Sequence, residues 1–561
     1  MISDAISSRI QPLMEQLDGT VRTELASVFE QCSKVIAEQQ EHIREQQRRI
    51  AILEEHRRLE ALARFASKAD RIAQIHPSQL ELLANEPGLT ETELDAVVDQ
   101  PAEEKKKEAP AVEAMAKSVR YLTKPHAGRG ALPAHLRRVD ILIDEPPAPL
   151  PDGTLPRELR RDVTERLAMV PAEYYVERIT TVSYCYPGNA AGGVHHGAAP
   201  ASLLPKSVLG PMVVIAMTVS KYADHQPVYR QVMALQRDHG IEISYPTADR
   251  AVITTAGLAT YIADAQLEEL IAGDYIQADE TRIQVMDRNV KGKTATGYLW
   301  TYSHPKGQVV YRYHPGRGGK HARDDLRSFK GWLQSDGYQV YQSIAGLFGE
   351  DVKHCACMAH VRRKFVEIVR ANRDAAGFSV IVDNAAALVA RIDELYGIER
   401  KMKEKNASAE EREAERAERS LPLFDALMSE MNRVAMDPDL LPGSGLSRAC
   451  AYALRLRNEL RRSFINGVTE IDNNRCEQSI RPVALGRKNW LHVGSQGAAP
   501  SVAAIMSLVE SCKRMGINPR NYLEDVLPQL AAAHPDKVAE LAKTLTPTRW
   551  QAARASVATA A

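Results

Sequence analysis

Three short runs rich in β-branched and aromatic residues lie between Asp274 and Gly316, and they limit most strongly what this chain can fold into. The runs are DYIQADETRIQVM, TGYLWTYSH and QVVYRYHPG, and turns that contain Gly or Asn separate them. Such runs predict an antiparallel meander of strands. Further along, ARDDLRSFKGWL predicts a short helix, GYQVYQS a strand, and HCACMAHVRRKFVEIVRANR a strand followed by a helix. This order predicts an α/β domain.

Three strands, a helix and a fourth strand are the order of a ribonuclease H-like domain, which carries metal-binding acids on its first strand and at its fourth. Asp279 lies within the first predicted strand, Asp336 immediately precedes the predicted fourth strand, and Glu477 lies inside DNNRCEQSIRPVALGRKNW. Three carboxylates within about 4 Å would repel by roughly 4 kcal/mol per pair at an effective dielectric near 20, so they stay ionised together only around cations. Oxygen ligands select hard ions such as Mg²⁺ or Mn²⁺, and two such ions can drive an in-line displacement at a phosphodiester.

Ordered blocks of sequence surround the three acids. They are ADET (278–281), GKTATGYLW (292–300), LQSDGY (333–338), AHVRRKF (359–365) and NNRCEQSIRPVALGRKNWLHVGS (473–495), with SKYADHQPVYRQ before them and ESCKRMGINPRNYLEDVL after them. Together these blocks closely resemble the DDE transposases of the insertion sequence 66 family, over roughly residues 120 to 530. The resemblance implies a ribonuclease H-like catalytic domain that a helical insertion interrupts before the last acid. It also implies that Asp279, Asp336 and Glu477 are the catalytic and metal-binding residues.

The resemblance and the sequence pattern together predict how the C-terminal half is organised. Residues 273–365 and 471–530 are expected to form the two parts of the catalytic domain. Residues 366–470 are rich in Ala, Glu and Arg, and they are expected to form the helical insertion. Residues 531–561 are expected to be a C-terminal tail.

Residues 205–272 have helical spacing and are expected to form a DNA-binding region. Gly240 is placed to end one helix, and Ser244 is placed to cap the next. The two helices joined by DHGIEIS resemble a helix-turn-helix in outline, a motif that can present its later helix to a DNA groove. A structural helical bundle remains an equal alternative.

The N-terminal region, residues 1–70, contains a seam of residues spaced alternately four and three apart. The seam consists of Leu25, Phe29, Cys32, Ile36, Gln39, Ile43, Gln46, Ile50 and Leu53. This heptad spacing predicts a coiled coil over residues 20–64, and hence a homo-oligomer, with a single helix packed on its own protein as the alternative. Residues 71–118 are expected to be a helical segment and a linker, because DQPAEEKKKEAPAVEAMAK has charge blocks and almost no large apolar residues.

Residues 119–204 are expected to form a basic arm and a small β-containing module. Members of the family usually carry a zinc-binding module there, built from two CxxC pairs. This chain has only Cys185 in that neighbourhood, and His195 and His196 are adjacent in an expected flexible loop, so zinc is not expected. Elsewhere Cys355, Cys357 and His360 offer three ligands with no fourth partner in the nearby sequence, and a core strand is the favoured interpretation.

Several basic residues near the acids are candidates for DNA contacts. They are Arg362, Arg363, Lys364, Arg475, Arg481, Arg487 and Lys488, together with the aromatic Trp490. Arg481 stands four residues after Glu477 on an expected helix, so it shares a face with that acid and can orient it or reach a phosphate. The GRKNW segment can grip a DNA backbone and stack on a base, with a solvated turn and a core tryptophan as the alternative. For Arg362, Arg363 and Lys364, surface solvation competes with DNA binding.

The sequence therefore predicts a transposase that uses two Mg²⁺ or Mn²⁺ ions. Its partners would be the terminal inverted repeats, target DNA, other copies of the chain and accessory proteins from the same element. Lys plus Arg (72) equals Asp plus Glu (72), so any electrostatic footprint of DNA binding must be local. No run approaches the roughly 20 apolar residues of a membrane helix, and a cytoplasmic, nucleoid-associated bacterial protein is expected. Two alternatives remain: a nuclease without strand transfer, and a DNA-binding protein whose acids no longer catalyse.

Overall fold

The computed structural model describes residues 18–65, 173–179, 183–185, 194–196, 202–204, 207–286, 293–372 and 379–560. Contacts set residues 100–180 apart from the rest of the chain, and every site discussed below lies in the remainder. The predicted linker and most of the predicted basic arm lie outside the described residues. None of the helices in the described ranges is long and apolar enough to cross a membrane.

Five strands form a mixed sheet in the order β5-β4-β3-β6-β7. The antiparallel part consists of β3 (Tyr275–Met286), β4 (Thr294–Ser303) and β5 (Val309–His314). The parallel part adds β6 (Gly331–Ser335) beside β3, and β7 (Val352–Ala356) beside β6. The predicted meander is therefore confirmed, and two parallel strands extend it.

The fourth strand lies earlier in the chain than the sequence predicted. GYQVYQS was expected to be a strand, but Gln339–Phe348 form helix α10, and the strand β6 is GWLQS. The apolar residues after Asp336 recur at helical spacing, since Tyr341, Ile344 and Ala345 are all buried. Asp336 consequently follows the fourth strand instead of preceding it, and it lies at the carboxyl end of a parallel strand.

Alternating residues of the sheet enter two different hydrophobic cores. Leu299, Val309 and Tyr311 belong to the first core, whereas Trp300 and Val310 belong to a smaller core on the opposite face. Helices α10 and α9 (Gly319–Asp325) complete the smaller core. The 3₁₀ turn Gly349–Asp351 follows α10 in the chain. This alternation means that neighbouring residues of one strand face different surroundings.

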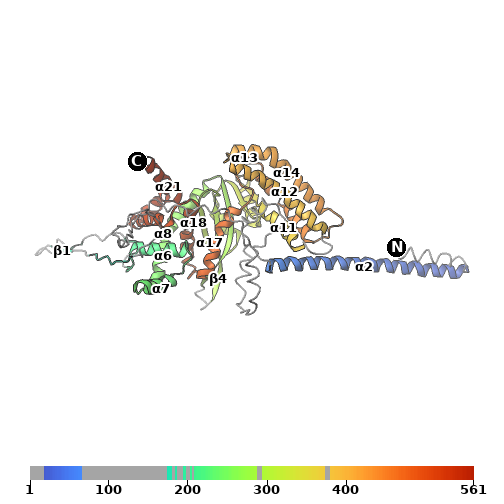
Figure 1. Cartoon of the computed structure of the whole chain (residues 1–561), viewed down its shortest axis with the longest axis horizontal. Coiled ribbons are helices and arrows are strands. Elements are labelled where there is room, and N and C mark those ends of the chain that lie inside the picture. Colours follow the sequence, from blue (N-terminus) through green and yellow to red (C-terminus); the bar gives the residue numbers. More distant parts are fainter. Residues whose placement is uncertain are drawn as a thin grey trace, which may run out of the picture. The chain divides into compact units, whose positions relative to one another are not determined.

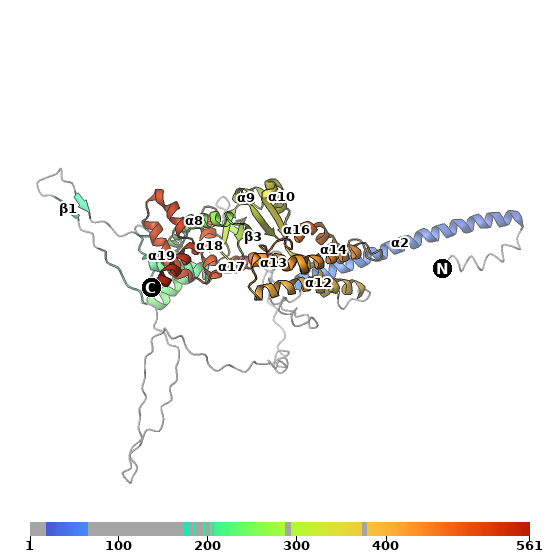
Figure 2. The same cartoon turned by 90° about the horizontal axis from the view of Figure 1, so that it is seen from above.

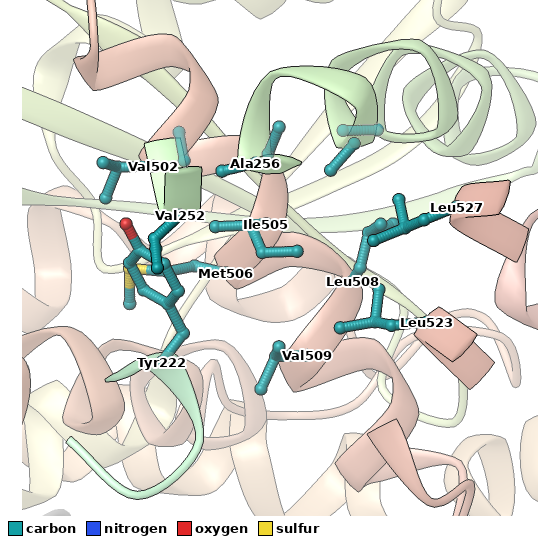
Figure 3. Close-up of a cluster of buried hydrophobic side chains, with 14 of the residues drawn as sticks. Tyr222, Val252, Ala256, Val502, Ile505, Met506, Leu508, Val509, Leu523 and Leu527 are labelled. Atoms are coloured by element: carbon teal, nitrogen blue, oxygen red, sulfur yellow. The ribbon is translucent and has the colours of Figure 1, made fainter. Parts of the chain in front are cut away.

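The first core brings together helices from both ends of the catalytic region. Its helices are α6 (Pro211–Tyr222), α8 (Tyr245–Ile271), α18 (Ala499–Arg514) and α19 (Pro519–Ala532). Figure 3 shows Tyr222 of α6 and Val252 of α8 beside Val502, Met506 and other side chains of α18. Burial of these apolar side chains holds segments about 250 residues apart in one unit.

The two predicted helix boundaries are confirmed. Helix α7 (Val228–His239) ends at Gly240, whose φ of 65° is the left-handed conformation that favours glycine. Helix α8 begins after Ser244, whose hydroxyl accepts a hydrogen bond from the Thr247 amide at 3.3 Å. The helix-turn-helix outline is not supported, because α8 is buried along its length against α6 and α18. The structural bundle, the other interpretation, describes this region better.

The expected C-terminal tail is folded instead. After the 3₁₀ turn Pro535–Lys537 come α20 (Val538–Thr544) and α21 (Pro547–Ala560). Leu545 and two residues of α20 belong to the first core. The Trp550 indole donates a hydrogen bond to Asp525 at 2.6 Å and lies edge-on to Tyr522. The prediction of a tail was wrong because the segment has only these few buried residues, and its sequence shows only a weak helical periodicity.

The predicted helical insertion is confirmed in the described residues. Its helices are α11 (Met358–Asn372), α12 (Ser379–Glu404), α13 (Ala409–Glu415), the π turn Arg416–Ser420, α14 (Leu421–Ala435), α15 (Gly445–Arg455) and α16 (Arg457–Arg462). Helices α12 and α14 pack side by side (Figures 1 and 2), around a second core of their own. The Met358 amide donates to the Ile471 carbonyl at 3.0 Å, so the chain enters and leaves the insertion at one place.

Helix α2 (Gly19–Phe65) spans 47 residues and contains the predicted seam. Near its C-terminal end Glu55 is buried and accepts a hydrogen bond from the Gly445 amide at 2.8 Å, so this end packs on its own chain. Ile43, Ile50 and Leu53 of the α2 seam are 53%, 55% and 65% exposed in the single chain. Coiled-coil pairing therefore stays a prediction for the part of the helix before Glu55.

A two-stranded sheet pairs β1 (Ser183–Cys185) with β2 (Val194–His196). The expected flexible loop around His195 and His196 is thus a short strand, because backbone pairing with residues 183–185 orders it. Residues 173–179 form neither helix nor strand.

Candidate active site

Asp279 and Asp336 come from neighbouring parallel strands. Gln277 of β3 pairs with Gln334 of β6, Asp279 lies two residues further along β3, and Asp336 directly follows the end of β6. Burial raises the pKa of Asp279 well above its ordinary value, and the negative charges of Asp336, Glu280 and Glu477 raise it further. The strand register therefore places two carboxylates side by side, and their repulsion favours the binding of a cation.

The loop that carries Asp336 is held at three points. The Asp336 carboxylate accepts a hydrogen bond from the Tyr338 amide at 2.8 Å. Gly337 has a φ of 92°, a conformation that disfavours other residues. The Tyr452 hydroxyl, from α15 of the insertion, donates to the Asp336 carbonyl at 3.0 Å. The insertion thus contacts the backbone of a candidate metal ligand.

Glu477 lies in the first turn of α17 (Asn474–Trp490), which packs on β3 and β4. The side-chain amide of Asn473 donates to the Ala278 carbonyl at 3.1 Å, next to Asp279. Burial raises the pKa of Glu477, while the positive charges of Arg363 and Arg481 lower it. One Glu477 oxygen lies 3.6 Å from the Arg363 guanidinium, and so Arg363 holds this carboxylate in place.

Glu280 is a fourth carboxylate that the sequence analysis did not identify. Strand alternation turns it away from Asp279 and toward the smaller core, where it is buried. Arg317 donates two hydrogen bonds to it at 2.6 and 2.8 Å, and the Tyr341 hydroxyl donates one at 2.9 Å. Burial raises the pKa of Glu280, as does Asp336, and Arg317 opposes both. Only its place beside Asp279 in ADET could have indicated Glu280, because Arg317 lies 37 residues away.

The basic run after His360 divides into three different environments. Arg362 is buried and pairs with Asp393 of α12 at 2.7 Å, so its prediction as a DNA contact was wrong. The cause is the helical spacing of α11, which turns Arg362 into the second core. Arg363 faces Glu477, and Lys364 is exposed over the Tyr452 ring at 4.6 Å.

The basic residues of α17 remain at the surface. Arg475, Arg481 and Lys488 are exposed, and Arg487 donates to the backbone carbonyl of Arg282. Trp490 is half-buried and packs against the first core, which fits its interpretation as a core tryptophan better than base stacking. The expected turn at GRKNW is the last part of α17.

Glu477 also joins a cluster with Cys357 and His360, whose candidate ligand atoms all lie within 4.8 Å of one another. The sequence near Cys357 and His360 does not contain this third ligand, because Glu477 is 117 positions beyond His360. His360 lies in α11 instead of on a strand. Cys355 is part of buried strand β7, as predicted, and burial raises its pKa to about 12.

Comparison with known proteins identifies relatives along most of the chain. A family model described as "Transposase IS66 family" matches residues 206–501, and one described as "IS66 C-terminal element" matches residues 507–542. The uncharacterised protein y4qI of Sinorhizobium fredii (strain NBRC 101917 / NGR234) is 31% identical over 72% of this chain and 75% of its own length. The uncharacterised protein y4hP of the same strain is 31% identical over 80% of this chain and 82% of its own length.

Proposed function

The chain belongs to the IS66 transposase family, and we propose that it binds the ends of its insertion sequence and catalyses metal-dependent strand cleavage and strand transfer. The observation that carries the proposal is the electrostatic coupling of Asp279 with Asp336 and Glu477, three acids from distant parts of the sequence. Carboxylates gathered around a buried acid with a raised pKa are typical of functional sites. The strand order and the position of the acids also support a ribonuclease H-like assignment for the catalytic domain.

Asp279, Asp336 and Glu477 would hold two divalent cations, Mg²⁺ or Mn²⁺, because oxygen ligands suit hard ions. When bound, such a pair activates the attacking hydroxyl and stabilises the leaving oxygen. The chain's own residues orient these ligands. Arg363 fixes Glu477, and Tyr452 fixes the backbone at Asp336.

Cationic side chains of α17 and α11 would contact the DNA backbone. The candidates are Arg363, Lys364, Arg475, Arg481, Arg487 and Lys488; Arg362 and Trp490 are left out because of their packing. Phosphate contacts of this kind position DNA without reading its sequence.

Substitution of the acids separates chemistry from binding. We expect Asp279→Asn, Asp336→Asn and Glu477→Gln each to slow cleavage of end DNA about 10³-fold or more, which corresponds to losing roughly 4 kcal/mol of transition-state stabilisation. Affinity for the same DNA should change little, because it depends on Lys and Arg contacts with phosphates. The double variant Arg487→Ala/Lys488→Ala should do the reverse, with weaker binding and a flatter salt dependence. Cleavage by Glu477→Gln at the original rate would remove Glu477 from the mechanism.

The same preparations distinguish the alternatives. Joining of cleaved ends to target DNA identifies a transposase. Hydrolysis without joining identifies a nuclease, and binding without either identifies a DNA-binding protein.

Self-association through α2 is the second part of the proposal. A long helix with an exposed apolar seam is poorly stable alone in water, and pairing with another copy would bury that seam. Ile43→Ser combined with Ile50→Ser should lower the oligomeric state, whereas Arg44→Ser and Arg48→Ser, outside the α2 seam, should leave it unchanged. Sedimentation showing equal masses for both double variants would contradict pairing through this seam.

A further inference from the structure

We propose that Cys357, His360 and Glu477 form a binding site for a soft divalent cation such as Zn²⁺, and that this cation inhibits the enzyme by taking Glu477 from the catalytic pair. The binding site stands on its own geometry, whereas the inhibition rests on the proposed function.

The three ligands come from two elements that meet beside the sheet. Cys357 lies between β7 and α11, His360 lies in the first turn of α11, and Glu477 lies in the first turn of α17. The Asn473 amide donates to the Cys357 sulfur at 3.2 Å, which fixes the start of α17 against the start of α11. The backbone therefore brings the thiol, the imidazole and the carboxylate together before any ion binds.

Two buried polar atoms at this place lack partners. Neither His360 Nδ1 nor Glu477 Oε1 has a hydrogen-bond partner among the residues that the structure describes, and the two atoms lie 3.5 Å apart. An unsatisfied buried polar group destabilises the folded chain, so a ligand that satisfies both atoms would stabilise it. Two tetrahedral ligands at zinc distances would lie about 3.4 Å apart, which is close to the observed separation.

The donor set indicates which ion would bind. Sulfur and imidazole nitrogen suit Zn²⁺ and similar ions much better than Mg²⁺, which prefers oxygen ligands. Zinc binding would displace the Cys357 thiol proton to solvent, since the thiolate is the form that ligates. Three protein ligands leave a fourth tetrahedral position for water or a phosphate oxygen.

Sharing of Glu477 makes the two kinds of site mutually exclusive. Arg363 contacts Oε2 of Glu477, while Oε1 faces His360, so an ion at the cysteine site would hold Oε1 away from Asp279 and Asp336. The catalytic pair would then lose one of its three acidic ligands. Inhibition by Zn²⁺ should consequently be relieved by chelation.

Cobalt(II) titration of the full chain tests the binding site without any activity measurement. Wild-type protein should take up one Co²⁺ with a cobalt–thiolate charge-transfer band and the intense visible bands of a tetrahedral site. Cys357→Ser should lose the charge-transfer band, and His360→Gln should weaken Co²⁺ binding at least tenfold. Cys355→Ser is the matched control, because Cys355 is a buried neighbour on β7 outside the cluster. Cys185→Ser should also retain the band, which excludes the β1–β2 hairpin as its source.

A band that persists in Cys357→Ser, or its absence from wild-type protein, would overturn the proposal. Thermal melting identifies a variant that has lost its fold, and His360→Gln then gives a second, independent result. Asp279→Asn should keep the cobalt spectrum, so failure of the catalytic assignment leaves this test intact. In cleavage assays with Mg²⁺, Zn²⁺ should inhibit wild-type protein reversibly, and inhibition of Cys355→Ser should match it. Equal inhibition of Cys357→Ser, if that variant retains measurable cleavage, would contradict the shared use of Glu477.

Discussion

The two acids on the sheet and the acid on α17 are positioned by different means. Asp279 lies on β3 and Asp336 directly follows β6, so the parallel pairing of these two strands brings the two acids together. Glu477 reaches the same place only after the chain has passed through the insertion, and Arg363 and Asn473 hold it there. Strand pairing therefore positions Asp279 and Asp336, whereas the position of Glu477 depends on how the insertion packs.

The largest effect is expected from a substitution of Arg362, which tests how far the protein depends on the packing of the insertion. In Arg362→Ala the buried Asp393 loses its partner, and we expect unfolding to become easier by about 3–5 kcal/mol, as for other broken buried ion pairs. The salt dependence of DNA binding should not change. Lys364→Ala, an exposed neighbour, should melt like wild type. A normal melting temperature with weakened DNA binding would instead restore Arg362 as a DNA contact.

A second substitution tests the pairing of the sheet strands, at the first residue of β6. Gly331 has a φ of 144°, and an added Cβ would lie 2.2 Å from the Asp274 carbonyl oxygen. Gly331→Ala should therefore destabilise the protein by roughly 3 kcal/mol and disturb the register that pairs Asp279 with Asp336. Gly346→Ala in α10, where nothing lies within 4 Å, should instead be neutral or stabilise by up to about 1 kcal/mol. Equal denaturation midpoints for the two variants would argue against strand register as the constraint.

Tyr452 connects the two regions directly. Tyr452→Phe removes the hydroxyl that donates to the Asp336 carbonyl, a loss of about 0.5–1.5 kcal/mol. We expect the Mg²⁺ concentration for half-maximal cleavage to rise about two- to tenfold, with unchanged affinity for DNA. Tyr261→Phe on α8, where the side chain is 45% exposed, is the control. An unchanged Mg²⁺ requirement would show that Asp336 is held by the sheet alone.

The last expected effect appears only at acidic pH and concerns His354, which lies on β7 beside the end of β6. Its ring lies 2.8 Å from the Ser335 hydroxyl, and burial lowers its pKa to about 3, with Arg462 adding to the shift. Below about pH 6.5 the unfolded chain binds a proton that the folded chain does not, so stability falls as pH decreases toward 3. His354→Gln should melt with a shallower pH dependence between these limits. Parallel melting curves for the two proteins would contradict this expectation.

The sequence predicted those features that rest on local periodicity and on ordered blocks. The meander, the helical insertion, the cap at Ser244 and the glycine stop at Gly240 all follow from a few neighbouring residues. The predicted position of the fourth strand was wrong because GWLQS has only five residues and shows no alternation of buried and exposed positions.

Features that depend on tertiary contacts could not be predicted. Glu280 and Arg362 are stabilised by partners 37 and 31 positions away, and the adjacent sequence does not show that either side chain is buried in an ion pair. Likewise, Cys357 and His360 lacked a visible ligand because Glu477 lies beyond the insertion.

The composition of the first core has a consequence for the order in which a ribosome makes this protein. The core needs α18, α19 and α20, which emerge last, to cover α6 and α8, which emerge some 250 residues earlier. Until then the parts of α6 and α8 that contact α18 and α19 in the folded chain stay exposed, and Glu477 has only just been synthesised when α18 begins. While the chain between Asp336 and Glu477 is being made, the nascent chain thus contains two of the three acids but cannot complete the catalytic site. Folding of the active protein is therefore delayed until translation is almost complete, and premature termination before α18 gives a fragment with exposed apolar helices instead of an active enzyme.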